Sequence, residues 1–280
     1  MPSDSDQVIY FRTFRDYQRL RELADRGERF VVIGGGFIGS EIAAALAMNG
    51  KKVTMLFPAE SIGDNIYPRD LSMFLNDYYK ERGVEIVTND TASVVEPRGD
   101  LSLVRTEQGR EFIADGVVAG LGITPNVDLA LVAGLKVENG IHVDDCLRTS
   151  HPDIHAAGDV AYFYNPALAK HIRVEHEDNA VTMGGYAGKS MAGQGEPYHH
   201  LPYFYSDLFD LGYEAVGELD SRLETVEDWN EPFKEGVVYY LREGRVRGVL
   251  LWNVWDKVPA ARELIAERGV FGPEEVKGRI

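Results

Sequence analysis

The chain has 280 residues, of which 44 % are hydrophobic and 26 % are charged, a composition typical of globular proteins. Its formal net charge of −16 disfavours nucleic acids and anionic lipid surfaces as partners, because both bind clustered Lys and Arg. The single cysteine, Cys146, excludes a disulfide within these residues, and no apolar run is long enough to span a membrane. The polar first seven residues carry no secretion signal, so we expect a cytoplasmic protein.

The first 127 residues alternate between strand and helix patterns. Strands are expected at residues 8–11, 30–33, 52–57, 84–88 and 116–120, and helices at 14–26, 37–48 and 69–82. Residues 91–113 read as a small antiparallel meander with two polar turns. Alternating strands and helices of this kind predict a doubly wound α/β domain from residue 30 to about residue 127.

The pattern changes after residue 128. We expect short strands at residues 140–143 and 154–157, a helix at 179–191, strands at 211–219, 236–241 and 245–255, and a last helix at 259–268. Residues 226–235 read as a short link between strands. The C-terminal part therefore predicts an α+β unit.

Residues 29–50 (RFVVIGGGFIGSEIAAALAMNG) read as an apolar strand, a glycine turn and an Ala-rich helix. Gly34, Gly36 and Gly39 have the G-x-G-x-x-G spacing of a dinucleotide-binding turn. One such glycine allows the tight turn, one lets the backbone approach a diphosphate, and one lets the helix pack against the strand. The alternative interpretation is a nucleotide-free α/β domain with a glycine-rich turn.

An acidic residue follows the second predicted strand of this unit. Glu60 lies 21 residues after Gly39, close to where an acid reaches the ribose 2′-hydroxyl of a dinucleotide. No Arg or Lys lies between residues 57 and 67, where a 2′-phosphate would need one. These features favour NADH over NADPH.

A second motif, T-x-x-P-x-I-x-A-x-G-D, occupies residues 149–159. It resembles the segment with which flavoproteins hold the ribityl chain of FAD: Gly158 allows close approach, and the Asp159 carboxylate accepts hydrogen bonds. The alternative is that Asp159 only caps a helix.

Together these motifs resemble the FAD- and NAD(P)-dependent pyridine nucleotide-disulfide oxidoreductases, and most closely the apoptosis-inducing-factor-like and ferredoxin-reductase-like members without a redox disulfide. The segments GITPN, AGDVAYFY, RVEHEDNAV, YSDL, GYEAVGELDS and LLWNVWDKVP carry the likeness along the chain. The resemblance implies an α/β fold with three parts. These are a Rossmann-like NAD-binding domain over residues 1–127, the C-terminal part of an FAD-binding domain over 128–202, and an α+β dimerisation domain over 203–280.

The resemblance also implies a function, hydride transfer from NADH to FAD and then to a non-dithiol acceptor such as a quinone, a redox protein or O₂. Glu41 and His176 would be the catalytic residues, and no metal site is expected. The implied cofactor-binding residues are Arg12, Gly34, Gly35, Gly36, Phe37, Ile38, Gly39, Glu60, Gly122, Gly158, Asp159, Glu175, Tyr205, Glu214 and Asn253. A homodimer is also implied.

No glycine turn precedes residue 29, so under this resemblance the N-terminal FAD-binding half is missing. That half would carry the Lys expected to pair with Glu41. Three alternatives therefore stay open: a non-catalytic NADH-binding module, one subunit of a split enzyme with a separate FAD-binding chain, and a truncated fragment. Tyr205 also stands where relatives have Trp, which implies weaker stacking on the cofactor rings.

Overall fold

A computed structural model describes residues 8–267 and 269–280 of the chain. Backbone contacts group it into two compact units. The first comprises the chain up to Gly122 together with Ser206–Gly212, and the second comprises Ile123–Tyr205 and Tyr213–Ile280. The predicted domain boundaries at residues 127 and 202 stay predictions, and the first seven residues and Arg268 lie outside the described part.

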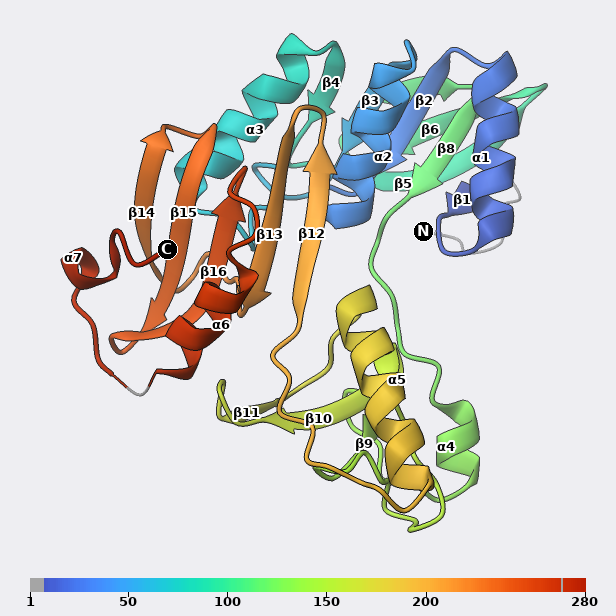
Figure 1. Cartoon of the computed structure of the whole chain (residues 1–280). Helices are drawn as coiled ribbons and strands as arrows, with labels where there is room; N and C mark the ends of the chain where they lie inside the picture. The colour runs from blue at the N-terminus through green and yellow to red at the C-terminus, as the bar shows by residue number, and fades with distance from the viewer. Residues whose placement is uncertain (1–7, 268) are drawn as a thin grey trace. The chain divides into compact units, whose positions relative to one another are not determined.

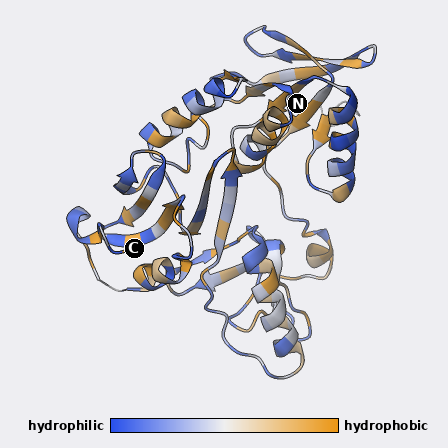
Figure 2. Cartoon of the chain, turned by 45° about the horizontal axis from the view of Figure 1, so that its top comes forward, coloured by the Kyte–Doolittle hydropathy of each residue, from blue (hydrophilic) through white to orange (hydrophobic). Residues whose placement is uncertain are grey.

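The first unit is built on a five-stranded sheet with the order β1-β8-β2-β3-β4, in which every pair is parallel (Figure 1). Its strands are β1 (Val8–Tyr10), β2 (Arg29–Ile33), β3 (Lys52–Leu56), β4 (Val84–Val87) and β8 (Gly116–Ala119). The central strands are rich in Val and Ile and almost wholly buried, as expected for parallel strands covered on both faces (Figure 2).

Three helices, α1 (Phe14–Arg26), α2 (Phe37–Met48) and α3 (Arg69–Glu81), accompany this sheet. Helix α1 begins with a capping box in which Thr13 and Asp16 bond to each other's backbone N–H groups. The meander of β5 (Ala92–Arg98), β6 (Leu101–Thr106) and β7 (Glu111–Ala114) shares an apolar core with alternate strand residues such as Val31 and Ile33. The meander therefore covers a face of the parallel sheet.

The N-terminal part of the second unit has a three-stranded sheet, β11-β10-β9. It consists of β9 (Ile141–His142), β10 (Ala161–Asn165) and β11 (Lys170–Ile172), with helices α4 (Asp128–Val132) and α5 (Glu177–Met191) and the 3₁₀ turn η1 (Gly158–Val160). Its core includes Phe163, Met183 and Tyr198.

The C-terminal sheet has five strands in the order β12-β13-β16-β15-β14. They are β12 (Tyr203–Leu208), β13 (Leu211–Gly217), β14 (Glu224–Glu231), β15 (Glu235–Arg242) and β16 (Arg245–Trp252). Helices α6 (Val258–Ala266) and α7 (Pro273–Val276) pack on it through Ala261, Leu264 and Val276. Leu168 and Leu201 join the same core, which ties the N-terminal part of this unit to its C-terminal sheet.

The predicted α/β class is confirmed, and two local predictions are wrong. Residues 154–157 are not a strand but form only an isolated bridge between Arg148 and His155, because the η1 turn starts at Gly158. Residues 226–235 are not a link, since most of them belong to β14 and its turn into β15. Strand β14 could not be recognised from the sequence because most of its residues are polar. Val226 is its buried residue.

Candidate functional site

The glycine turn between β2 and α2 is shaped by close backbone contacts. Gly34 has a φ of 122°, and a Cβ there would lie 2.3 Å from the carbonyl oxygen of Gly120. A Cβ on Gly39 would lie 2.1 Å from the carbonyl oxygen of Gly34, and a Cβ on Gly35 would lie 2.8 Å from the Phe57 ring. The packing of the turn itself therefore requires these three glycines.

Gly36 is different, because a Cβ there would meet no atom within 4 Å and its φ of −88° suits any residue. It is the N-cap of α2, no side chain caps this helix end, and no acidic residue lies in the first turn with Phe37 and Ile38. The positive end of the helix dipole is therefore not offset locally. An open glycine at such a helix end suits a diphosphate that approaches the backbone.

The loop after β3 is bonded to this turn. The Gly63 N–H donates to the Gly35 carbonyl at 2.9 Å, and the Asn76 side chain donates to the Glu60 carbonyl at 3.0 Å. The Glu60 side chain is exposed and forms an ion pair of 2.7 Å with Arg69 at the start of α3. Arg69 lies just beyond residues 57–67, the segment without Arg or Lys, so the sequence did not indicate a cation beside Glu60.

Glu41 lies on α2 just after the turn and is half-buried. Its Oε1 accepts a hydrogen bond of 2.5 Å from the hydroxyl of Ser206, which no sequence pattern indicated. Burial raises the pKa of the Glu41 carboxyl, the bond from Ser206 opposes this rise, and the Asp207 carboxylate adds to it. The Tyr79 hydroxyl of α3 donates to the Ser40 carbonyl at 3.1 Å, which fixes this part of α2.

The two remaining predicted residues of the first unit are Gly122, which follows β8, and Arg12, which lies between β1 and α1. Gly122 is exposed shortly after β8 and has a φ of 81°. Arg12 is exposed before α1, and its backbone N–H donates to Asp16 at 3.1 Å. The first unit thus brings the glycine turn, Glu41 and Glu60 to neighbouring elements.

In the second unit, Gly158 and Asp159 form the η1 turn. Gly158 has a φ of 75°, its N–H lies 3.3 Å from the Met183 sulfur, and a Cβ there would lie 3.6 Å from the Cβ of Ala180 on α5. Asp159 is half-buried, and its carbonyl accepts from Arg173 at 3.2 Å. The turn therefore packs against α5 and needs glycine for its backbone conformation.

His176 is the N-cap of α5 and stacks on Phe204, with ring centroids 4.3 Å apart. Burial lowers its pKa from the ordinary 6.5, although Glu175, Asp159 and Asp178 act in the opposite direction. The imidazole is therefore mainly neutral at pH 7. Glu175 forms an ion pair of 2.5 Å with Arg173. Asp159, Glu175 and His176 are thus neighbours in this unit.

The three predicted residues on the C-terminal sheet lie on separate strands or turns. Tyr205 on β12 is 57 % exposed. Glu214 on β13 has a buried Oε2 without a hydrogen-bond partner among the described residues, and burial, followed by the Asp256 charge, raises its pKa. Asn253 has a φ of 51° and donates to the Lys234 carbonyl at 2.8 Å. The buried, unpartnered oxygen of Glu214 is suited to a donor from a ligand.

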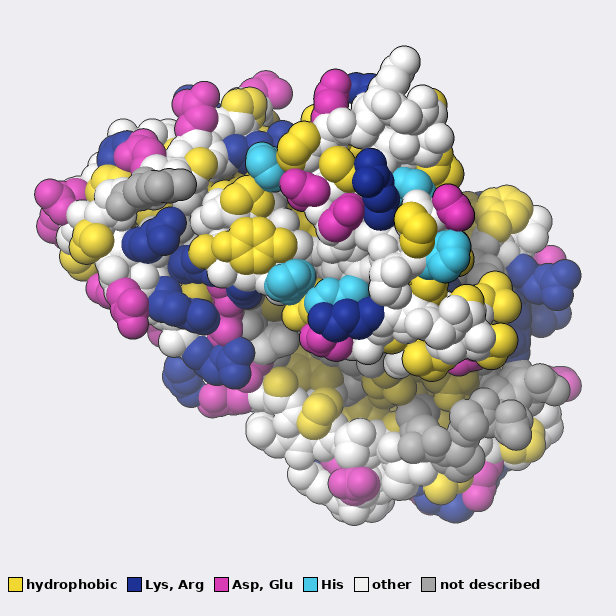
Figure 3. Space-filling model, turned by 90° about the horizontal axis from the view of Figure 1, so that it is seen from below, with side chains coloured by type: hydrophobic (Ala, Val, Ile, Leu, Met, Phe, Trp, Pro, Cys, Tyr) yellow, Lys and Arg dark blue, Asp and Glu magenta, His cyan; other side chains and the backbone are white. Residues whose placement is uncertain are grey.

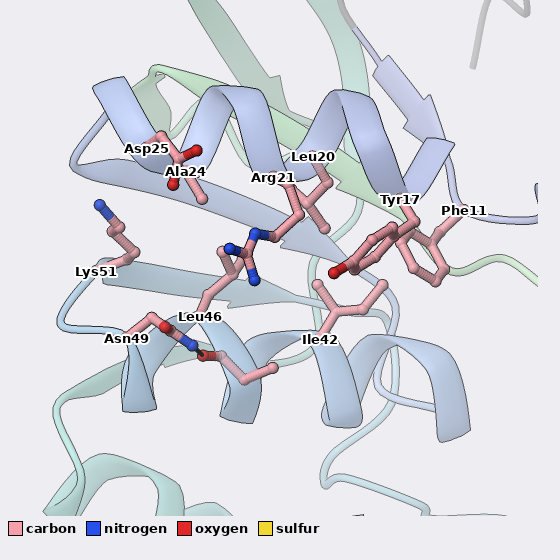
Figure 4. A pocket seen from close by; sticks show the side chains of 11 residues that line it. Phe11, Tyr17, Leu20, Arg21, Ala24, Asp25, Ile42, Leu46, Asn49 and Lys51 are labelled. Carbon is pink, nitrogen blue, oxygen red and sulfur yellow. Dashed lines mark hydrogen bonds between the residues drawn. The ribbon is translucent and has the colours of Figure 1, made fainter. Parts of the chain in front are cut away.

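A separate groove of about 450 Å³ lies between α1 and α2, with Leu20, Ile42 and Leu46 among the residues that line it (Figure 4). Arg21 points into it from α1. None of the predicted site residues lines this groove. In open α/β sheets, ligands bind outside the carboxyl ends of the strands, so the glycine turn is the better candidate for a nucleotide.

On the face in Figure 3, Lys and Arg side chains are interspersed with Asp and Glu side chains, and several Lys and Arg side chains gather at its left. Within residues 8–267 and 269–280, no group of three His, Cys, Asp or Glu side chains could hold a metal ion. No helix of the described residues combines the length and apolar composition needed to cross a bilayer.

Comparisons with known proteins agree with this arrangement. Residues 1–184 match the family model for pyridine nucleotide-disulphide oxidoreductases. The chain belongs to that family. Residues 187–232 and 227–267 match the C-terminal model for mitochondrion-associated apoptosis-inducing factor, so the predicted family and its apoptosis-inducing-factor-like character are confirmed.

Two curated relatives illustrate the range of the family. The ferredoxin–NAD(+) reductase component of an anthranilate 1,2-dioxygenase system from Burkholderia cepacia is 34 % identical over 98 % of this chain. Apoptosis-inducing factor 1 from Dictyostelium discoideum is 32 % identical over 95 % of it. The chain spans 68 % of the first relative's length and 54 % of the second's.

A solved ferredoxin reductase of the CYP199A2 system from Rhodopseudomonas palustris has a TM-score of 0.87 and 28 % identity, over 96 % of this chain and 67 % of its own. Members of this oxidoreductase family use FAD and NAD(P)H. The prediction of an NAD(P)H-dependent flavoprotein class is therefore confirmed at the level of the family.

Proposed function

We propose that this chain supplies the NADH-binding part and one side of the FAD-binding part of a flavoprotein reductase. NADH lies with its diphosphate on the glycine turn, its adenosine ribose near Glu60, and its nicotinamide toward Glu41. FAD, when bound, supplies the hydride-accepting chemistry. The part of this chain is to bind and align the nucleotide and to keep water away from it.

The observation that carries this proposal is the open space at Gly36. Gly34, Gly35 and Gly39 are surrounded by the protein's own atoms, whereas within the described part of the chain no atom lies within 4 Å of a Cβ placed on Gly36. A ligand that needs close approach to the backbone explains a glycine at this position. The uncapped N-terminus of α2 supplies the positive dipole end that a diphosphate requires.

The residues of the second unit fit one side of FAD. Gly158 lets the backbone turn at the η1 segment, and the Asp159 carboxylate can accept hydrogen bonds from ribityl hydroxyls. His176 is a neutral ring held in place by Phe204, so it can offer one donor and one acceptor nitrogen beside the flavin.

The test compares NADH binding by the full chain and by Gly36→Val, measured by calorimetry. We expect Gly36→Val to fold normally and to lose at least about tenfold in affinity, because its side chain occupies the diphosphate position. Gly185→Val is the control, since Gly185 also has open space around its Cβ position. Equal affinity of Gly36→Val and the wild type would refute the proposal.

A non-catalytic NADH-binding module, or one subunit of a split enzyme, is the second candidate. It is favoured by the exposed apolar side chains of the second unit, among them Leu129, Val132 and Val181, which are 87 %, 89 % and 68 % exposed. Visible spectra after addition of FAD, followed by NADH oxidation with a dye acceptor, separate the candidates. A flavin spectrum with turnover supports the reductase, whereas NADH binding without either supports the module.

We also propose a small redox protein as the electron acceptor, because the Burkholderia relative is named as a ferredoxin–NAD(+) reductase component. A quinone and O₂ are the other acceptors to be tested in the same assay. We also propose a homodimer and a cytoplasmic location. The proposed location differs from that of the Dictyostelium relative, which is named as mitochondrial.

A further inference from the structure

The turn between β12 and β13 is anchored on α3 of the first unit, far from its own position in the chain. Phe209, with a φ of 64°, packs edge-on against the Tyr79 ring, with centroids 4.9 Å apart. Asp210 accepts hydrogen bonds from the Tyr78 hydroxyl and from Arg82, the latter at 2.6 Å. Ring packing and a charge-assisted bond therefore hold this turn in one place.

On β12, just before this turn, Ser206 presents a buried hydroxyl to the helix of the glycine turn. Ser206 is only 1 % exposed, and its Oγ donates to Oε1 of Glu41 at 2.5 Å. That distance is typical of a hydroxyl that donates to an ionised carboxylate. Because Ser206 is buried and the turn that follows it is tied to α3, the bond restricts the orientation of the Glu41 side chain.

The other groups that act on Glu41 favour its neutral form. Burial raises its pKa, and the negative charge of Asp207 raises it further. Tyr79 on α3 also interacts with Glu41, and burial holds its own pKa well above the ordinary value. Ser206 is therefore the group among these that favours the ionised carboxylate.

We propose that Ser206 is a positioning residue that holds the Glu41 carboxylate, ionised and in one orientation, at the nicotinamide end of the bound nucleotide. This inference rests on the proposed function, because it needs NADH on the glycine turn. It extends that function by assigning a role to a residue of the segment Ser206–Gly212, which belongs to the first unit although it is distant from the glycine turn in the sequence. The orientation of Glu41 on α2 thus depends on Ser206, which lies 165 positions away in the sequence.

The first experiment follows the ionisation of Glu41 in the full chain without any ligand. The ¹³C signal of its carboxyl carbon is recorded against pH in glutamate-labelled protein and is identified by its loss in Glu41→Gln. We expect the midpoint to rise by about one pH unit in Ser206→Ala and to stay near the wild-type value in Ser206→Thr, which keeps the hydroxyl.

A matched control removes a buried hydroxyl that makes no bond. Ser72 on α3 is fully buried, and its hydroxyl has no partner among the described residues, so Ser72→Ala makes the same chemical change without touching Glu41. We expect Ser72→Ala to leave the Glu41 midpoint unchanged. A midpoint that is equal in Ser206→Ala and the wild type would overturn the inference.

The second experiment measures NADH affinity by calorimetry between pH 5 and 8. We expect Ser206→Ala to bind about fivefold more weakly at neutral pH and to shift the pH dependence upward, as the carboxyl midpoint does. Unchanged affinity in Ser206→Ala, with a shifted midpoint, would overturn the positioning role alone. No NADH binding by the wild type would instead refute the proposed function.

Discussion

The four glycines of the segment from the end of β2 into α2 look alike in the sequence, yet their surroundings differ. Gly34, Gly35 and Gly39 are enclosed by protein atoms, and Gly36 faces open space. The spacing of the motif could predict a turn of this kind, because each position has a known steric task. It could not predict Ser206 at Glu41, since no local pattern connects residues that are 165 positions apart.

We propose that the choice between NADH and NADPH depends on the exposed ion pair of Glu60 and Arg69. Glu60 and Arg69 are both largely exposed, so their contact contributes little stability and either side chain is available to a ribose. Glu60→Gln removes the acceptor charge for a 2′-hydroxyl and leaves Arg69 unpaired beside the place of a 2′-phosphate. We expect NADPH affinity to rise about tenfold and NADH affinity to fall, as measured by calorimetry with both coenzymes.

Glu22→Gln on α1 serves as the control for this substitution, because it removes the same charge from an exposed position outside the predicted site. If Glu60→Gln and Glu22→Gln changed the NADPH affinity equally, the change would result from the net charge of the chain. Glu60 would then not lie beside the ribose.

At the scale of elements, the sequence predicted the first unit better than the second. Strands β2 and β3 and helices α1 to α3 have a clear apolar period and glycine or proline boundaries, and they lie within two residues of their expected ends. Strand β14 was missed because ETVEDWNE buries little apolar surface, so its pattern is that of a polar loop. The short β10 and β11 follow a turn, where periodicity carries little information.

Helix α5 is held to α6 by one carboxylate, which makes the second unit sensitive to acid. Asp178 accepts from His200 at 2.6 Å and from Arg262 at 3.2 Å. Burial alone would raise its pKa, but the bond and charge of His200, the Tyr203 N–H and Arg262 outweigh burial and lower it below the ordinary 3.8. Asp178 therefore stabilises the fold above about pH 4, and this contribution is lost as the pH falls through the lower folded value.

Asp178→Asn should consequently lower the free energy of unfolding at pH 7 by about 1–3 kcal/mol, because it removes a charged acceptor from two partly buried donors, His200 and Arg262. The difference between the variant and the wild type should shrink as the pH falls below about 4, where the unfolded carboxyl binds a proton first and the folded carboxyl follows at a lower pH. Urea unfolding at pH 7 and pH 3 measures both values. A difference that did not depend on pH would assign the effect to packing instead of charge.

At the scale of the whole molecule, a net charge of −16 opposes the approach of any anion, and NADH is an anion. The attraction at the N-terminus of α2 acts over contact distance, whereas the repulsion is long-ranged and is screened by salt. We therefore expect NADH affinity to increase about two- to threefold when ionic strength rises from about 0.01 M to 0.15 M, as the Debye length falls from about 30 Å to 8 Å.

Where clustered cations bind an anionic ligand, the affinity falls as ionic strength rises, which is the opposite of the change expected here. The salt dependence therefore distinguishes binding by the helix dipole from binding by side-chain cations. Adenosine, which carries no charge, is the control ligand and should show no dependence on salt. If NADH bound more weakly at higher ionic strength, a side-chain cation such as Arg69 would dominate the binding of the diphosphate or ribose. The helix dipole and the open glycine would then be secondary, and Arg69→Gln should abolish the dependence on salt.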